Sequence, residues 1–319
     1  MPPILDALFN PILPIFAIAG VGYVLGRMKI FDAAMALTIN RFVVMVALPA
    51  LLFSFLASVP FREFDFAFVT IYFVASMTLY ALGFCIMRYG FRLGPRESLL
   101  LGMACCFTNH VFFVIYIATI LYGDAAKIPL LAIITFDAFL IFGATFLYMD
   151  IVVSGARSPL SAAKVFFKNP MIVALILGLG VGFFALPVHA GIMTYATFAG
   201  GAAAPASMFA LGVVLSGVAL DFRDGPAWTT VTLKLVFHPL LTFLGFALLF
   251  PAALAVAPAD GFGGGDIWLK ALVLTAAGPC GAMPFVIALQ HGVNTTRIVR
   301  AIIFSTVLSL FTLAIIASL

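Results

Sequence analysis

Long apolar stretches alternate with short polar clusters along the whole chain. An apolar stretch of about 20 residues is long enough to cross a bilayer as a helix. With charged residues and Gly/Pro clusters taken as boundaries, the pattern predicts spans near residues 8–26, 37–57, 66–87, 98–121, 128–150, 170–188, 195–219, 227–251, 267–290 and 298–318. We therefore predict an all-α polytopic membrane protein with about ten transmembrane helices.

Composition supports this class. The chain has 319 residues, of which 65% are hydrophobic and 9% charged, and a soluble domain of that length could not bury so much apolar surface. The N-terminal segment MPPILDALFN contains Asp6 but no Lys or Arg, which argues against a cleaved signal peptide. The four cysteines lie in apolar segments without metal-ligand spacing, so the sequence predicts neither a disulfide framework nor a metal site.

Positive charges gather in alternate loops between the predicted spans. The even-numbered loops hold only Arg62 and Lys127, with Lys270 at a helix start. The odd-numbered loops and their edges hold Arg27, Lys29, Arg41, Arg88, Arg92, Arg96, Arg157, Lys164, Lys168, Arg223, Arg297 and Arg300. By the positive-inside rule the odd loops are cytoplasmic and both termini face outward, an N-out/C-out topology. The net charge of +4 reflects this topology, and we see no nucleic-acid-binding patch.

Two short motifs recur at matching places in the two halves of the chain. The second span contains 47-ALPALLF-53 and the seventh contains 203-AAPASMF-209, while 113-FVIYIA-118 in the fourth resembles 285-FVIALQ-290 in the ninth. These matches predict two five-helix repeats, 1–152 and 170–319, joined by a cytoplasmic linker at 153–169. Because five is odd, the repeats are inverted, as in many secondary transporters.

The ninth span, 274-LTAAGPCGAMPFVIALQHG-292, carries two glycines and two prolines in its middle. Non-helical backbone at membrane depth is tolerated only where it is buried in protein or lines a water-filled cavity. We therefore predict a broken helix here, with a partner break in the fourth span at 105-CCFTNHVFF-113. Two broken helices that cross would point their N-termini, each worth roughly half a positive charge, at one place suited to an anion. The predicted substrate-binding residues are Thr108, Asn109, His110, Gly278, Pro279, Cys280, Gly281 and Pro284.

Asp137, within 133-IITFDAFLIFG-143, is predicted to be a coupling residue that takes up H⁺ or helps to hold Na⁺. A charged group at the centre of a span costs about 2.5–3.5 kcal/mol, so it must face protein or a cavity. The alternative is a buried carboxyl group paired with a hydroxyl or with Lys234. His238 either joins the coupling network or only kinks its helix with Pro239, and Lys234 either snorkels to an interface or neutralises a carboxylate. Ser305 either lines the crossing point or packs helices together.

Several segments resemble the auxin efflux carrier family, and the resemblance covers essentially the whole chain. They are 40-NRFVVMVALPALLF-53, 207-SMFALGVVLSG-217, 234-KLVFHPLLTF-243, the ninth span and 303-IFSTVLSLFTL-313. In fold, this family is similar to bile-acid symporters and sodium/proton antiporters. The resemblance implies a scaffold domain of spans 1, 2, 6 and 7, a transport domain of spans 3–5 and 8–10 that moves like an elevator, and a homodimer through the scaffold. It also implies small organic anions as substrates, including malonate or malate in bacteria and auxin in plants.

The resemblance also implies particular substrate contacts. In the plant branch an asparagine at each crossover and prolines contact the substrate. Asn109 fits the first asparagine position, but the ninth span has no asparagine, so auxin is not expected as the substrate. Scaffold-side contacts are expected at Pro49, Phe53, Pro205 and Phe209.

The predicted function is therefore secondary active transport of a small mono- or dicarboxylate across the inner (plasma) membrane. Coupling to H⁺, to Na⁺ or to the membrane potential stays open at this point. The alternatives are an Na⁺-coupled carrier like the bile-acid symporters and an anion channel, although no carbonyl filter or charged ring is evident. The sequence contains neither HExxH nor GxSxG nor a nucleotide-binding motif, so we predict no enzyme activity and no cofactor.

Overall fold

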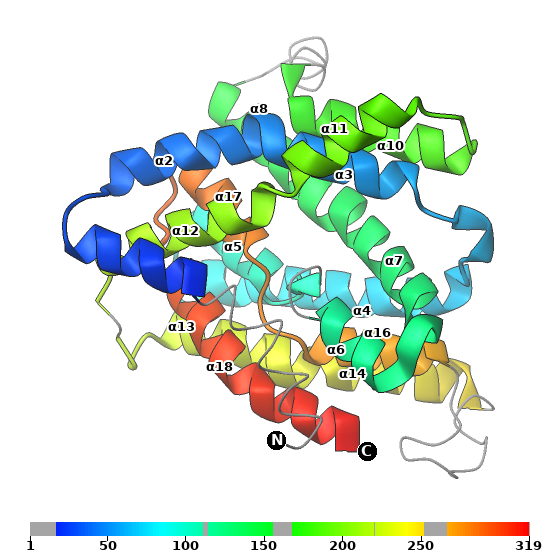
Figure 1. The fold of residues 1–319 in the computed structure, drawn as a ribbon. Coiled ribbons are helices and arrows are strands. Elements are labelled where there is room, and N and C mark those ends of the chain that lie inside the picture. The colour runs from blue at the N-terminus through cyan, green and yellow to red at the C-terminus, as the bar shows by residue number, and fades with distance from the viewer. Residues whose placement is uncertain (1–16, 111–113, 156–167, 220, 252–266, 319) are drawn as a thin grey trace.

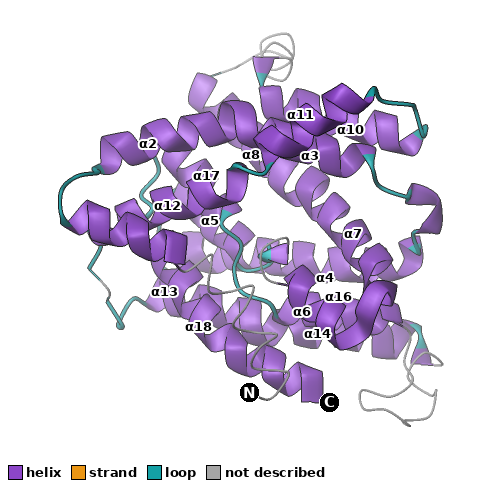
Figure 2. Cartoon of the chain, in the orientation of Figure 1, coloured by secondary structure: helices purple, strands orange, loops and turns teal. Residues whose placement is uncertain are grey.

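The computed structural model describes residues 17–110, 114–155, 168–219, 221–251 and 267–318. Within these ranges every regular element is helical, and the one β-type contact is an isolated antiparallel bridge (Figure 2). The first half contains a helix at Ala17–Arg27, α2 (Ala33–Phe42), η1 (Val43–Ala47), α3 (Leu48–Ala57), α4 (Phe66–Cys85), η3 (Ile86–Gly90), α5 (Pro95–Ala104), α6 (Ile115–Tyr122), α7 (Lys127–Phe136), η6 (Asp137–Gly143) and α8 (Ala144–Ser154). The second half contains α10 (Pro170–Phe183), α11 (Ala190–Gly200), α12 (Ala203–Ser216), α13 (Gly225–Thr232), η7 (Leu233–Phe237), α14 (His238–Leu249), α16 (Ile267–Ala277), α17 (Met283–Gln290) and α18 (Thr296–Ser318).

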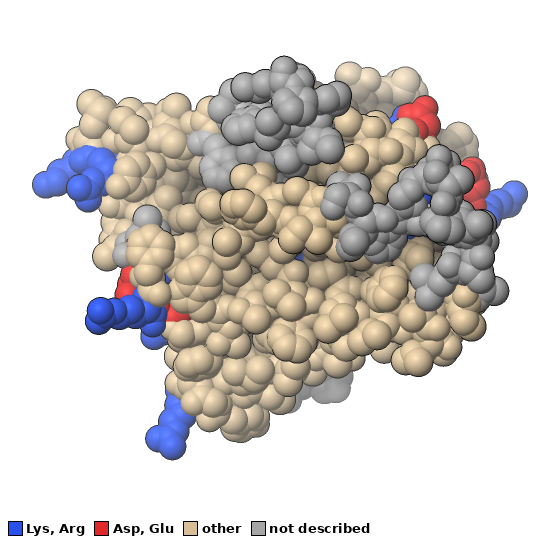
Figure 3. All heavy atoms as spheres, turned by 90° about the horizontal axis from the view of Figure 1, so that it is seen from below, with Lys and Arg blue, Asp and Glu red and all other residues tan. Residues whose placement is uncertain are grey.

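Several of these helices can cross a membrane. Six are long and apolar enough by length and composition, namely Ala33–Ala57, Phe66–Gly90, Ile117–Val153, Ala190–Ser216, Gly225–Leu249 and Thr296–Ile316. On the face seen in Figure 3, the charged side chains lie at two opposite ends and leave a broad uncharged belt between them. The protein is therefore a helical, multi-pass membrane protein.

The predicted seventh span differs from the structure at its start and in its middle. It begins at Ala190 instead of residue 195, and a turn at residues 201–202 divides it into α11 and α12. Its glycines and alanines serve close packing, because a Cβ at Gly200 would lie 2.7 Å from Leu51 Cα. The start of the predicted first span and most of the predicted linker at 153–169 lie outside the described residues.

The helices pack as two groups that meet near the middle of the molecule. In one group α3 packs against α10 and α11, and α12 packs against α2. In the other group α4 packs against α5 and α14, α14 against α16, and α18 against α13 and α16. The two groups form the upper and lower parts of the view in Figure 1, and the short helix α17 contacts both α2 and α5. The segment between α16 and α17 is thus placed where the two groups meet.

Ion pairs join the ends of α5, α13 and α18. Arg297 Nη1 lies 2.7 Å from Glu97 Oε1, and Arg300 Nη1 lies 2.6 Å from Asp224 Oδ2. Arg300 also donates to the carbonyl oxygen of Ala219, in the loop that follows α12, over 2.6 Å. The two arginines that the charge pattern assigned to the cytoplasmic side therefore also fix the ends of these helices.

Candidate functional site

Both predicted helix breaks are present. Residues 105–109, between α5 and α6, and residues 278–282, between α16 and α17, are non-helical. The second break was expected from its glycines and prolines. The first break has neither residue type, and its only sequence signal is the polar cluster Thr108–His110.

The two breaks pair with each other through their backbones. The Asn109 N–H donates to the Pro279 carbonyl oxygen over 3.0 Å, and the Gly281 N–H donates to the Phe107 carbonyl oxygen over 2.9 Å. An antiparallel bridge between Thr108 and Cys280 lies between these bonds. Each break therefore supplies the hydrogen-bond partners that the other one lost, in a region where water is scarce.

Two glycines make this close approach possible. A Cβ at Gly278 would lie 2.7 Å from Thr108 Cγ2, and a Cβ at Gly281 would lie 2.7 Å from Phe107 Cδ1 and 2.9 Å from Thr108 O. A side chain at Gly281 would require the backbone of the partner break to move, and one at Gly278 would require the methyl group of Thr108 to shift. The lack of a side chain at these two glycines allows the breaks to come into contact.

Side chains from three other segments satisfy the carbonyl groups at the end of α16. The bonds run from Thr108 Oγ1 to Thr275 O (3.1 Å), from Lys234 Nζ to Ala276 O (2.6 Å) and from Thr312 Oγ1 to Ala277 O (3.0 Å). The last carbonyl groups of a helix have no partner within that helix. The C-terminal end of this half-helix is thus capped inside the protein.

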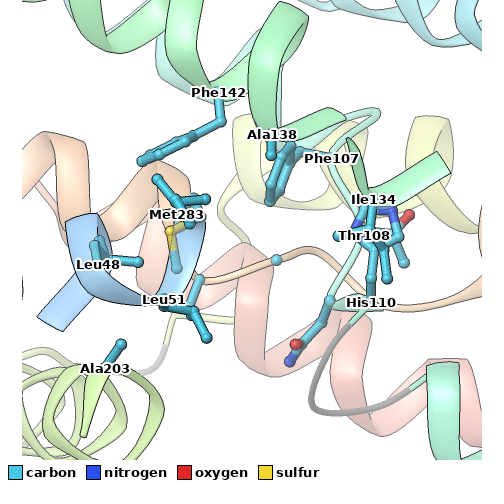
Figure 4. A pocket seen from close by; sticks show the side chains of 14 residues that line it. Leu48, Leu51, Phe107, Thr108, His110, Ile134, Ala138, Phe142, Ala203 and Met283 are labelled. Atoms are coloured by element: carbon cyan, nitrogen blue, oxygen red, sulfur yellow. The ribbon is translucent and has the colours of Figure 1, made fainter. Parts of the chain in front are cut away.

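A cavity of about 80 Å³ lies beside the paired breaks, between the two helix groups. One water needs roughly 10–15 Å³ of such space, so the cavity has room for several waters or one small solute. Figure 4 shows Leu48, Leu51 and Ala203 on one side of the cavity and Thr108, His110 and Ile134 on the other. The remaining lining residues are Leu52, Phe107, Asn109, Ala138, Phe142, Gly281, Ala282 and Met283.

The cavity is apolar apart from one polar corner. Among the described residues its lining contains no Lys, Arg, Asp or Glu side chain, and the polar side chains there are Thr108, Asn109 and His110. The N-terminal end of α17 opens on the cavity through Ala282 and Met283, and no side chain caps it. A helix N-terminus with free N–H groups attracts negative charge. The cavity therefore favours a small anion that has an apolar portion.

Asp137 lies directly behind this polar corner with its side chain 1% exposed. Its Oδ2 is 2.9 Å from His110 Nε2, without hydrogen-bond alignment, and it accepts a hydrogen bond from the Tyr72 hydroxyl over 3.4 Å. Its Oδ1 is buried and has no hydrogen-bond partner among the described residues. Asp137 also begins the π-helical segment η6, and such segments are frequent at functional sites. This carboxyl group faces protein, as expected from the sequence. Its partner Tyr72 is not predicted from the sequence, because an aromatic residue in an apolar span is typical of ordinary helix packing.

Lys234 and His238 form a second buried cluster. His238 Nδ1 lies 3.3 Å from Lys234 Nζ, and His238 Nε2 lies 2.9 Å from Ser76 Oγ. His238 thus joins a hydrogen-bond network, besides preceding Pro239 in the first turn of α14. Lys234 is fully buried, so it does not snorkel to an interface, and its hydrogen-bond partners among the described residues are a carbonyl group and an imidazole ring. The carbonyl group of Ala276, left free by the break, explains this placement.

The other predicted residues lie away from the cavity lining. Ser305 accepts a hydrogen bond from the Cys280 N–H over 3.1 Å and so supports the break. Gly278, Pro279, Cys280 and Pro284 are in or next to the break but do not line the cavity, and neither do Pro49, Phe53, Pro205 and Phe209. Phe209 packs edge-on against Phe31, with ring centroids 4.9 Å apart. Substrate contacts at these eight positions stay predictions.

On α3 the cavity is lined by Leu48, Leu51 and Leu52, which are sequence neighbours of the predicted Pro49 and Phe53. Leu48, Leu51 and Leu52 follow the i, i+3, i+4 spacing of one helix face. That spacing could have indicated the lining face of α3. It was hidden because the helix is apolar on all sides.

The fold and the cavity together define the class: a multi-pass helical membrane protein with two broken helices paired beside a solute-sized cavity. The family described as membrane transport protein matches residues 7–159 and again residues 156–317, and the chain belongs to this family. Membership confirms the resemblance drawn from the sequence and makes the protein a transporter, not an enzyme. A protein of Rhizobium meliloti (strain 1021) described as "Putative malonate transporter" is 26% identical to this chain over 306 residues, which are 94% of this chain and 92% of that protein.

Proposed function

We propose that the protein is a secondary active transporter for a small organic anion, a mono- or dicarboxylate of the size of malonate or malate, in the inner (plasma) membrane. The observation that carries the proposal is the cavity, which has α3 and α12 on one side and the paired breaks on the other. Its polar corner and the α17 N-terminus suit a carboxylate. The name of the Rhizobium meliloti relative supports a malonate-like substrate.

We further propose the predicted architecture of ten spans in two inverted repeats with both termini outside. Two consecutive family matches that meet within the predicted linker, and one helix break in each half, support the repeats. The group around α3, α10, α11 and α12 corresponds to the proposed scaffold, and the group that carries the breaks corresponds to the proposed transport domain. Movement of the second group past the first would carry the cavity from one side of the membrane to the other while keeping the contacts between the breaks. Asp137 and His110 would couple this movement to an ion.

Asn109 provides the test of the substrate site. Its backbone is held by Pro279, and its amide group, which can donate and accept hydrogen bonds, belongs to a cavity-lining side chain. A hydrogen bond to a charged group contributes about 1.5–3 kcal/mol. The Asn109→Ala variant should therefore lower malonate uptake by about tenfold or more. Uptake is measured with radiolabelled malonate in proteoliposomes that contain the purified full chain.

Asn294→Ala is the matched control, since Asn294 is exposed and only accepts a bond from the Thr296 N–H. It should transport like the unaltered protein. Undiminished uptake by Asn109→Ala would remove Asn109 from the site. A potential-driven current without substrate would instead indicate a channel and overturn the proposed function.

A further inference from the structure

Lys234 places a buried ammonium group at the C-terminal end of the half-helix α16. Its side chain is fully buried, and Nζ donates to the Ala276 carbonyl oxygen over 2.6 Å. The C-terminus of a helix carries roughly half a negative charge, so a cation is favoured at this position. The second neighbour of Nζ is the ring nitrogen Nδ1 of His238, at 3.3 Å.

Acidic side chains do not explain how the buried charge of Lys234 is stabilised. Within the described residues no carboxylate oxygen forms an ion pair with Nζ, and the nearby Asp137 contacts His110 and Tyr72 instead. A buried charge is tolerated only when it is paired or hydrogen-bonded. The partner of the ammonium group is therefore the end of the broken helix itself.

The same kind of place holds the coupling ion in other carriers with broken helices. There, carbonyl groups of unwound backbone and the C-terminal ends of half-helices coordinate Na⁺. In this protein the carbonyl groups of Thr275 and Ala277 already accept hydrogen bonds from threonine hydroxyls. The carbonyl group of Ala276, between them, accepts a hydrogen bond from Lys234. The ammonium group thus stands where a monovalent cation would bind.

We propose that Lys234 is a built-in cation, which supplies at the paired breaks the positive charge that Na⁺ would otherwise supply, so that transport does not require Na⁺. An ammonium group held by its own side chain does not dissociate in each cycle. The charge stays at the end of α16 in every state of the carrier. The consequence for Na⁺ rests on the proposed transport function, whereas the role of Lys234 at the helix end does not.

The first experiment compares salts. Initial malonate uptake by the unaltered protein in proteoliposomes should stay the same within about twofold when NaCl is replaced by choline chloride, because no Na⁺ site needs to be filled. Stimulation by Na⁺ of about tenfold or more would overturn the inference while leaving the proposed function intact.

The second experiment removes the charge in two ways. Lys234→Ala leaves a space with a free carbonyl group, and Lys234→Met fills the space without a charge. In choline chloride both variants should lose malonate uptake by about tenfold or more. Ethylammonium should restore uptake several-fold in Lys234→Ala only, since the space in Lys234→Met is closed. Lys127→Met is the control, because Lys127 is exposed and pairs only with Asp124. Full activity of Lys234→Ala in choline chloride would overturn the inference.

A third measurement needs no substrate. Ethylammonium or Na⁺ should raise the thermal unfolding midpoint of purified Lys234→Ala but not that of the unaltered protein, because only the variant has a vacant cation site. The absence of any rise with either cation would overturn the inference. If the variant folds only when ethylammonium is present, that dependence supports it, whereas misfolding in every salt beside a folded and active Lys234→Met contradicts it. If the unaltered protein takes up no malonate in any salt, the proposed function fails, and these unfolding data still decide the role of Lys234.

Discussion

Replacing Gly281 with alanine is expected to abolish malonate uptake and to lower the thermal stability of the protein. The added Cβ would lie 2.7 Å from Phe107 Cδ1 and 2.9 Å from Thr108 O. The buried phenyl ring would have to shift, and the carbonyl oxygen belongs to the partner break and cannot move without weakening the 2.9 Å bond between the Gly281 N–H and Phe107 O. Overpacking of this kind costs about 1–3 kcal/mol, and the weakened hydrogen bond adds up to about 1 kcal/mol.

The measurements are the thermal unfolding midpoint in detergent and malonate uptake in proteoliposomes. Gly180→Ala is the matched control, because Gly180 lies in α10 and nothing is within 4 Å of the Cβ position. It should keep both stability and uptake. If Gly281→Ala behaves like Gly180→Ala, the tight pairing of the two breaks is not needed for transport.

Replacing Asp137 with asparagine is expected to uncouple transport from the proton gradient. The amide has the shape of the carboxyl group and can keep the Tyr72 contact, but it cannot take up and release a proton. For one proton per substrate, a gradient of one pH unit is worth about 1.4 kcal/mol and drives about tenfold accumulation. We expect the accumulation of malonate by the variant to fall to the level of equilibration, while exchange of internal for external malonate continues.

The readouts are malonate accumulation under an imposed pH gradient and malonate exchange without a gradient. Asp124→Asn is the control, because the side chain of Asp124 is 86% exposed and pairs with Lys127 at the surface. Retention of gradient-driven accumulation and of its pH dependence by Asp137→Asn would exclude Asp137 as the coupling group.

The helical fold could be predicted from the sequence because hydrophobicity fixes where a chain can lie in a bilayer. The break at residues 278–282 was also predictable, since glycine and proline leave the helical path there. The hydrogen bonds of Phe107 with Gly281 and of Asn109 with Pro279 could not be predicted from the local sequence pattern, because they join segments far apart in the chain. The repeats, the orientation and the division into scaffold and transport domains stay predictions.

The polar side of the candidate site was easier to predict than its apolar side. Asn109 and His110 stand out because polar side chains inside a span need a partner or a cavity. Leu48 and Phe142 carry no such signal, since nearly every residue of a membrane helix is apolar. Lys234 stands out as a charged residue within an apolar segment, but its partner is a main-chain carbonyl group, which no side-chain pattern can reveal.

The mutual hydrogen bonding of the two breaks also bears on how the protein is made. The bridge between Thr108 and Cys280 joins positions separated by more than half of the chain. During synthesis the first break therefore enters the bilayer long before its partner exists, with the Asn109 N–H and Phe107 carbonyl groups still unpaired. Assembly of the broken helices is complete only when residues 278–282 have been synthesised, so the first half of the chain cannot by itself form the crossing point.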